Sequence, residues 1–159
     1  MCEDTGMQRI AIEDRLAIEE LVYRYAWASD GRDFQALRAL FCDDASFVLH
    51  GPDGAVAEMV QGAETIVAWV EQRHRAEFAR GDQRRHLTGN FLLDSCDGSS
   101  AVARSYLCVL AVSTGQELRV SVMGRYEDHL RRQPNGWRFH RRLVFVEGKA
   151  AAVGRASSP

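Results

Sequence analysis

The sequence predicts an α+β fold in a single domain, and two patterns support this. In the first half, three segments carry apolar residues at helical spacing. In the second half, four long strand candidates are separated by short turns that contain glycine, asparagine or serine. Because short connections join neighbouring antiparallel strands, the second half is predicted to form an antiparallel meander.

The first helix is predicted from Ile10 to Ser29. Its apolar face comprises Ile18, Leu21, Val22, Tyr25 and Ala28. Acidic residues gather near its start, where the helix dipole favours negative charge, and Gly31 provides a stop. Trp27 and Trp137 are both expected in the core.

A second, short helix and a strand pair follow. Asp33 is a plausible N-cap, ahead of an apolar stripe of Phe34, Leu37, Leu40 and Phe41. Residues 45–50 favour a strand, a turn follows at 51–54, and a short strand is predicted around 56–60. The third helix is predicted over residues 62–80, and His74 lies on its apolar stripe.

The meander is predicted to contain strands over residues 84–93, 100–112, 117–131 and 136–146. The ordered domain therefore spans residues 10–147, and the polar ends, 1–9 and 148–159, are expected to be flexible. The strand over 100–112 is apolar on both faces. Helices cover one face, so a partner subunit is expected on the other, in a homodimer or a higher homo-oligomer.

Composition excludes several classes of protein. The chain has 159 residues and a net charge of −2, which argues against a nucleic-acid-binding surface. No apolar run is long enough to span a membrane, and the acidic N-terminus does not resemble a signal peptide, so a cytoplasmic protein is expected. The four cysteines match no zinc-binding spacing and are expected to be free thiols. Metal and phosphate-binding motifs are absent, so no metal and no cofactor are expected.

Three residues suggest proton-transfer chemistry. Tyr25 and Asp30 close the first helix, and His86 lies on the first strand of the meander. A phenol, a carboxylate and an imidazole are the usual parts of such a site, and a histidine can accept a proton near neutral pH. By strand alternation Asn90 shares a face with His86, where it is expected to orient the substrate.

Each of these residues also has a purely structural interpretation. His86 fits a hydrogen-bonded core histidine, Asp30 fits a carboxylate that caps the end of a helix, and Tyr25 fits an ordinary member of the apolar stripe.

Several phrases together resemble the SnoaL-like branch of the NTF2-like superfamily. The resemblance covers residues 10–147 and rests on the segments around 25–34, 39–47, 85–90, 124–128 and 136–142. It implies a cone in which a curved antiparallel sheet wraps around the long N-terminal helix, with two further helices and a pocket at the open end. Members with this fold include dehydratases, isomerases and polyketide cyclases, and also proteins with no enzymatic role.

The resemblance also implies roles for individual residues. Asp30 and His86 match the dyad of the scytalone dehydratase, bile acid 7α-dehydratase and lindane dehydrochlorinase group, and Tyr25 matches a third site position. An arginine on the last strand recurs in that group as a substrate-binding residue. Arg142 is favoured for it, although the neighbouring Arg141 leaves the register open. The patterns of ketosteroid isomerase and limonene epoxide hydrolase fit less well.

The expected function is a cofactor-independent lyase or isomerase of the dehydratase kind. His86 would act as base and Asp30 as its partner, on a hydrophobic cyclic small molecule. Two alternatives remain open, a polyketide cyclase and a non-catalytic protein that binds small molecules.

Overall fold

The structure, a computed structural model, describes residues 10–79, 81–113, 115 and 117–149. Residues 1–9 and 150–159 lie outside these residues, so the flexible N-terminus expected at 1–9 and most of the flexible tail expected at 148–159 are not described. The elements, in chain order, are α1 (Ile12–Gly31), α2 (Phe34–Ala39), β1 (Phe41–His50), β2 (Val56–Gln61), α3 (Ala63–Phe78), β3 (Asp82–Cys96), β4 (Ser100–Ser113), β5 (Arg119–Gln133) and β6 (Gly136–Lys149). The predicted α+β fold is confirmed, and β6 continues two residues beyond the expected end of the domain at 147.

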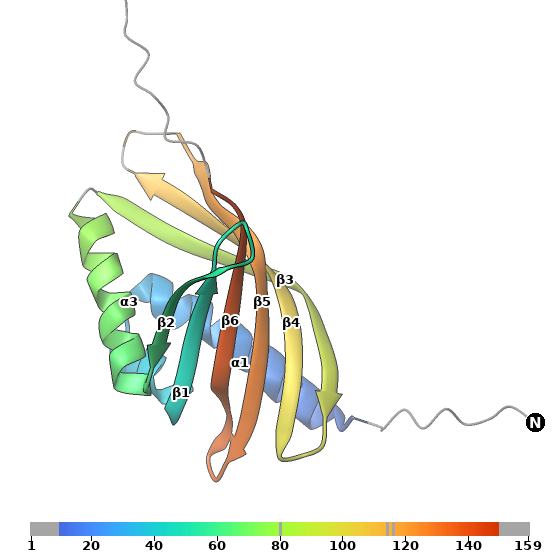
Figure 1. Cartoon of the computed structure of the whole chain (residues 1–159). Helices are drawn as coiled ribbons and strands as arrows, with labels where there is room; N and C mark the ends of the chain where they lie inside the picture. The colour runs from blue at the N-terminus through green and yellow to red at the C-terminus, as the bar shows by residue number, and fades with distance from the viewer. Residues whose placement is uncertain (1–9, 80, 114, 116, 150–159) are drawn as a thin grey trace, which may run out of the picture.

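One six-stranded sheet has the order β2-β1-β6-β5-β4-β3. Strands β3 to β6 form the predicted antiparallel meander, and β1 pairs with β2 as the predicted hairpin. The hairpin joins the meander through a parallel pairing of β1 with β6. Figure 1 shows the curved sheet, with α1 lying across it and α3 beside β1 and β2.

Helix α1 buries the face that the apolar spacing predicts. Ile18, Val22 and Tyr25 are each at most 4% exposed. The helix ends at Gly31, and the next residue, Arg32, takes a left-handed backbone (φ 56°) and donates its N–H to the carbonyl oxygens of Ala28 and Ser29. Trp27 was expected in the core, but it is 81% exposed because it lies two residues, about half a turn, away from Tyr25.

Both shorter helices form, but α2 ends at Ala39, and Phe41, which was expected on its apolar stripe, is instead the first residue of β1. The Asp33 side chain caps α2 by accepting the N–H of Ala36 at 2.9 Å. The buried stripe of α3 includes Ile66, Val70 and His74. These helices cover part of one sheet face, and the hydrophobic core fills the space between the helices and the sheet.

The opposite face of the meander leaves apolar side chains exposed. In β4, Leu107 and Val109 point into the core, whereas Tyr106 is 60% exposed. Together with exposed apolar residues on β3, β4 and β5 it forms what we call the outer apolar patch, which consists of Leu87, Leu92, Tyr106, Val112, Val120 and Met123. Cross-strand pairing makes the patch continuous, since Leu87 and Met123 flank Cys108 from the two sides.

Strand β3 is interrupted by a bulge at Asn90. The register with β4 passes from Gly89–Tyr106 to Leu92–Arg104, and Asn90 takes a left-handed backbone with φ 51°. Side-chain alternation therefore does not continue through this residue, and Asn90 is exposed.

Among the described cysteines, Cys42, Cys96 and Cys108 are free thiols, as predicted, and Cys2 lies outside the described residues. None of the described helices is long and apolar enough to cross a membrane.

Candidate active site

A cavity of about 300 Å³ lies between the sheet and the helices α1 and α3. Its walls are mainly apolar and aromatic, with side chains such as Phe47, Trp69 and Leu107. The polar groups that line it include Tyr25 from α1, His74 from α3 and His86 from β3. A largely apolar cavity with a few convergent polar groups is typical of a small-molecule site.

Asp30 and His86 are joined by two hydrogen bonds. Asp30 Oδ1 lies 2.6 Å from His86 Nδ1, and Asp30 Oδ2 accepts the backbone N–H of His86 at 2.7 Å. The side chains are only 12% and 8% exposed, respectively. The Asp30 carboxylate is not among the residues that line this cavity; together with His86 it lines a separate hollow of about 650 Å³ between the end of α1 and β3.

This arrangement fixes the chemistry that His86 can perform. An ionised carboxylate only accepts hydrogen bonds, so Nδ1 of His86 must carry a proton. In the neutral ring Nε2 then keeps its lone pair, and this is the nitrogen that can accept a proton. Such a ring can take a proton from a ligand, and Asp30 stabilises the imidazolium that forms.

Tyr25 lies beside the dyad at the floor of the cavity. Its ring is edge-on to that of His86, with centroids 6.3 Å apart. Burial raises the pKa of Tyr25, against an opposing effect from the guanidinium of Arg142. The hydroxyl therefore stays protonated near neutral pH and is available as a hydrogen-bond donor.

Arg142 is the inward-facing member of the arginine pair on β6, and Arg141 is exposed. The Arg142 guanidinium donates to both carboxylate oxygens of Asp128, at 2.7 and 2.8 Å, and both side chains are almost fully buried. It lies 4.0–4.2 Å from the ring centroids of Tyr25, Tyr126 and Phe139. Arg142 was expected to bind substrate, but it does not line the cavity, because its guanidinium is bound to Asp128 and packs against the ring of Tyr25.

Asn90 is not brought to this cavity. The bulge turns it outward, into a separate hollow of about 380 Å³ on the outer face that Tyr106 and Arg125 also line. Of the five residues proposed from the sequence, Tyr25 and His86 therefore line the cavity. Asp30 contacts His86 and Arg142 contacts Tyr25, but neither lines the cavity.

Sequence reasoning missed polar groups that line the cavity or contact its lining residues. Glu58 accepts a hydrogen bond from Trp69 and, at 2.8 Å, another from Arg73, whose guanidinium stacks over the Trp69 ring. Burial alone would raise the pKa of Glu58, but these hydrogen bonds lower it. Arg84, two residues before His86, also lines the cavity and pairs with Glu77 on α3.

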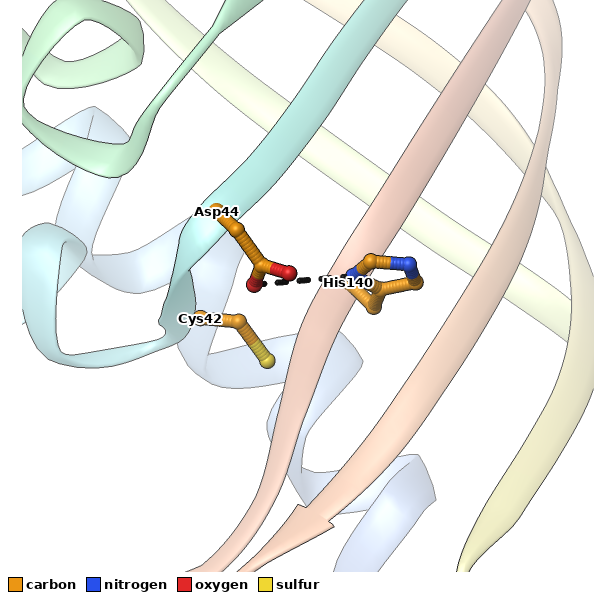
Figure 2. Close-up of side chains that lie close together, drawn as sticks. All are labelled: Cys42, Asp44 and His140. Atoms are coloured by element: carbon orange, nitrogen blue, oxygen red, sulfur yellow. Dashed lines mark ion pairs between the residues drawn. The ribbon is translucent and has the colours of Figure 1, made fainter.

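A cluster of potential metal ligands lies outside this cavity. Among the described residues, the ligand atoms of Cys42, Asp44 and His140 all lie within 4.8 Å of one another (Figure 2). Arg131 already donates to both Asp44 oxygens at 3.1 Å, and its Nη2 lies 2.8 Å from His140 Nδ1. Burial also raises the pKa of the Cys42 thiol, which disfavours the thiolate that a metal needs. The Arg131 guanidinium therefore supplies the positive charge that pairs with Asp44 in this cluster.

Comparison with known proteins agrees with this architecture. Residues 11–143 match the SnoaL-like domain family. The uncharacterized protein Rv2910c of Mycobacterium tuberculosis is 32% identical over 145 residues, which cover 88% of this chain and 90% of that protein.

Two solved structures from Novosphingobium aromaticivorans illustrate the shared fold. An NTF2-like protein with a cystatin-like fold is 29% identical, with a TM-score of 0.73 over 88% of this chain and 86% of that one. A putative scytalone dehydratase is 20% identical, with a TM-score of 0.72 over 93% of each chain. At this identity the second likeness establishes the fold alone.

Proposed function

Because the chain belongs to the SnoaL-like domain family, we propose that it is a cofactor-independent lyase of the dehydratase kind, acting on a hydrophobic cyclic small molecule. The observation that carries the proposal is the pair of hydrogen bonds by which Asp30 fixes His86 at the wall of a mainly apolar cavity. A subunit that only binds ligands has no need of an imidazole held in one tautomer by a buried carboxylate.

The proposed reaction is an elimination of water. Nε2 of His86 takes a proton from a carbon next to a carbonyl group, and Asp30 stabilises the resulting imidazolium. The electron pair of the broken C–H bond forms a C=C bond as the neighbouring C–O bond breaks. The imidazolium then returns its proton to the departing hydroxyl, which leaves as water. The cycle restores neutral His86 and consumes no other reactant.

The proposed role of Tyr25 is to donate a hydrogen bond to an oxygen of the substrate. Its hydroxyl stays protonated because burial raises its pKa, so it can donate a hydrogen bond to the carbonyl as negative charge develops there. Arg142, which is bound to Asp128, packs against the Tyr25 ring and holds it in place. Isomerisation uses the same first step, with the proton returned to a different carbon.

The family contains proteins that process small hydrophobic molecules, and the size of the cavity fits a compound of one or two fused rings. The test is a screen of cyclic hydroxy ketones against the purified protein, read by mass spectrometry as the loss of one water molecule. The Asp30→Asn variant serves as the control, since it keeps the cavity and alters only the dyad. Binding of compounds with no turnover by the wild type would instead support a non-catalytic binding protein.

We also propose that two copies associate through the outer apolar patch. Six exposed apolar side chains on neighbouring strands form a contiguous surface of the kind that marks protein interfaces. A two-fold axis would place the same patch on both partners.

A further inference from the structure

Two consecutive residues at the end of α1 each hold a histidine. Asp30 holds His86, as described above. Ser29 Oγ lies 3.1 Å from Nε2 of His74, and both side chains are buried. Ser29, His74 and His86 all line the same cavity. The cavity therefore contains a carboxylate–imidazole pair and, beside it, a hydroxyl–imidazole pair that the proposed reaction does not use.

The two pairs differ in their electrostatic surroundings. Burial, together with the positive charges of Arg84 and Arg32 and the neighbouring His86, lowers the pKa of His74 to about 4, although Asp30 acts in the opposite direction. His74 therefore stays neutral near pH 7. A neutral imidazole bonded to a hydroxyl offers one hydrogen-bond donor and one acceptor, whichever tautomer the ring adopts.

We propose that the Ser29–His74 pair is a second recognition point of the cavity and binds a neutral oxygen of the substrate, either a hydroxyl or a carbonyl. This inference rests on the proposed function and narrows its substrate class. The substrate is then a mainly apolar ring system with oxygen at two places, one at the reacting centre beside His86 and one beside His74.

The surroundings also restrict the charge of the group that binds. A buried site that keeps its own imidazole uncharged also disfavours a cationic ligand group, because desolvation and the positive charges of Arg84 and Arg32 both oppose it. An ammonium group of a ligand is therefore disfavoured at this point. A hydroxyl or carbonyl meets both the donor and the acceptor without such a penalty.

The pair also links α1 to α3, and the His74 ring packs edge-on against Phe34 at 6.2 Å. The experiment must therefore separate recognition of a ligand from a purely structural link. A structural link affects the binding of all ligands alike, whereas a recognition point discriminates between ligands with and without an oxygen.

The test compares two probes of similar shape, 1-naphthol and 1-methylnaphthalene. Their dissociation constants are measured by NMR titration of the wild type and of the variants Ser29→Ala and His74→Phe. Ser121→Ala is the matched control, because Ser121 also lines the cavity but its hydroxyl donates to the carbonyl oxygen of Val109 at 3.0 Å. The ¹⁵N signals of the His74 ring are followed in the wild type, which needs no variant to fold.

The wild type is expected to bind 1-naphthol about 5-fold tighter than 1-methylnaphthalene, the usual effect of one added hydrogen bond. The preference should disappear in Ser29→Ala and His74→Phe and persist in Ser121→Ala, and 1-naphthol should shift the His74 ring signals.

An unchanged preference in Ser29→Ala, or unshifted His74 signals on binding of 1-naphthol, would overturn this inference alone. Failure of both probes to bind the wild type would overturn it together with the hydrophobic substrate class proposed above.

Discussion

Asp30 binds His86 through both of its carboxylate oxygens, one on the ring nitrogen Nδ1 at 2.6 Å and one on the backbone N–H at 2.7 Å. The second bond positions the carboxylate independently of the ring. It also makes the pair sensitive to replacement of either oxygen, because an amide has only one acceptor to offer to two donors.

Asp30→Asn is therefore expected to reverse the tautomer of His86. The backbone N–H cannot give up its proton, so the amide oxygen should face it and turn the NH₂ group toward Nδ1. The proton then moves to Nε2, which can no longer accept one from the substrate. Turnover should fall on the order of 10²- to 10⁴-fold. ¹⁵N NMR of the ring should show the Nε2–H tautomer, and persistence of Nδ1–H would contradict this explanation.

Arg142→Met is expected to lower stability rather than ligand affinity. It leaves the Asp128 carboxylate, which is 1% exposed, without its partner. Removing one member of a buried ion pair costs about 3–5 kcal/mol. The free energy of unfolding from urea denaturation measures this, and the exposed neighbour variant Arg141→Met is the control. A loss below about 1 kcal/mol would show that the pair does not hold this part of the core.

His74 is expected to make the protein less stable in mild acid. Its pKa is lowered to about 4 in the folded chain, so between pH 4 and 6.5 the unfolded chain binds more protons and stability falls as the pH falls. The expected loss from this group between pH 7 and pH 5 is about 2 kcal/mol.

Urea denaturation at the two pH values should show this loss in the wild type and in His129→Phe, which alters a half-buried histidine beside Glu127, and a smaller loss in His74→Phe. Equal losses in all three proteins would assign the effect to other groups.

The outer apolar patch is expected to form a homodimer interface. Light scattering should give about 36 kDa, twice the chain mass of 17.8 kDa. Met123→Lys should convert the protein to a monomer, because it introduces a charge into the patch. Met59→Lys makes the same change at an exposed methionine on β2, outside the patch, and should leave the dimer intact. A wild-type monomer would refute the interface.

Local patterns in the sequence predict most of the fold. The apolar spacing of α1 and the turn residues of the meander depend on near neighbours in the chain, and the structure reproduces both. The parallel pairing of β1 with β6 joins segments far apart in the chain, and no local pattern reports it. The wrong prediction for Trp27 has a different cause. The helical spacing already placed Trp27 on the side of α1 opposite Tyr25, away from the core.

The candidate site was only partly predictable, for the same reason. Asp30 and His86 were found because they match a known pattern of residues. Ser29 and His74 had no such pattern, and their contact depends on how α1 packs against α3. Asn90 was misplaced because strand alternation assumes an unbroken register, and a bulge interrupts it. Arg142 faces inward, but it was expected to bind substrate and instead pairs with Asp128 on the neighbouring strand, outside the cavity lining.

The most direct test of the central claim is the turnover of His86→Ala on a compound that the wild type dehydrates in the screen. If His86 is the base, kcat/KM should fall on the order of 10²- to 10⁴-fold while the circular dichroism spectrum and the binding of the compound remain unchanged. Ser121→Ala, which removes a different polar group from the cavity, should remain close to the wild type. Near-wild-type turnover by a folded His86→Ala protein would contradict the proposed dyad.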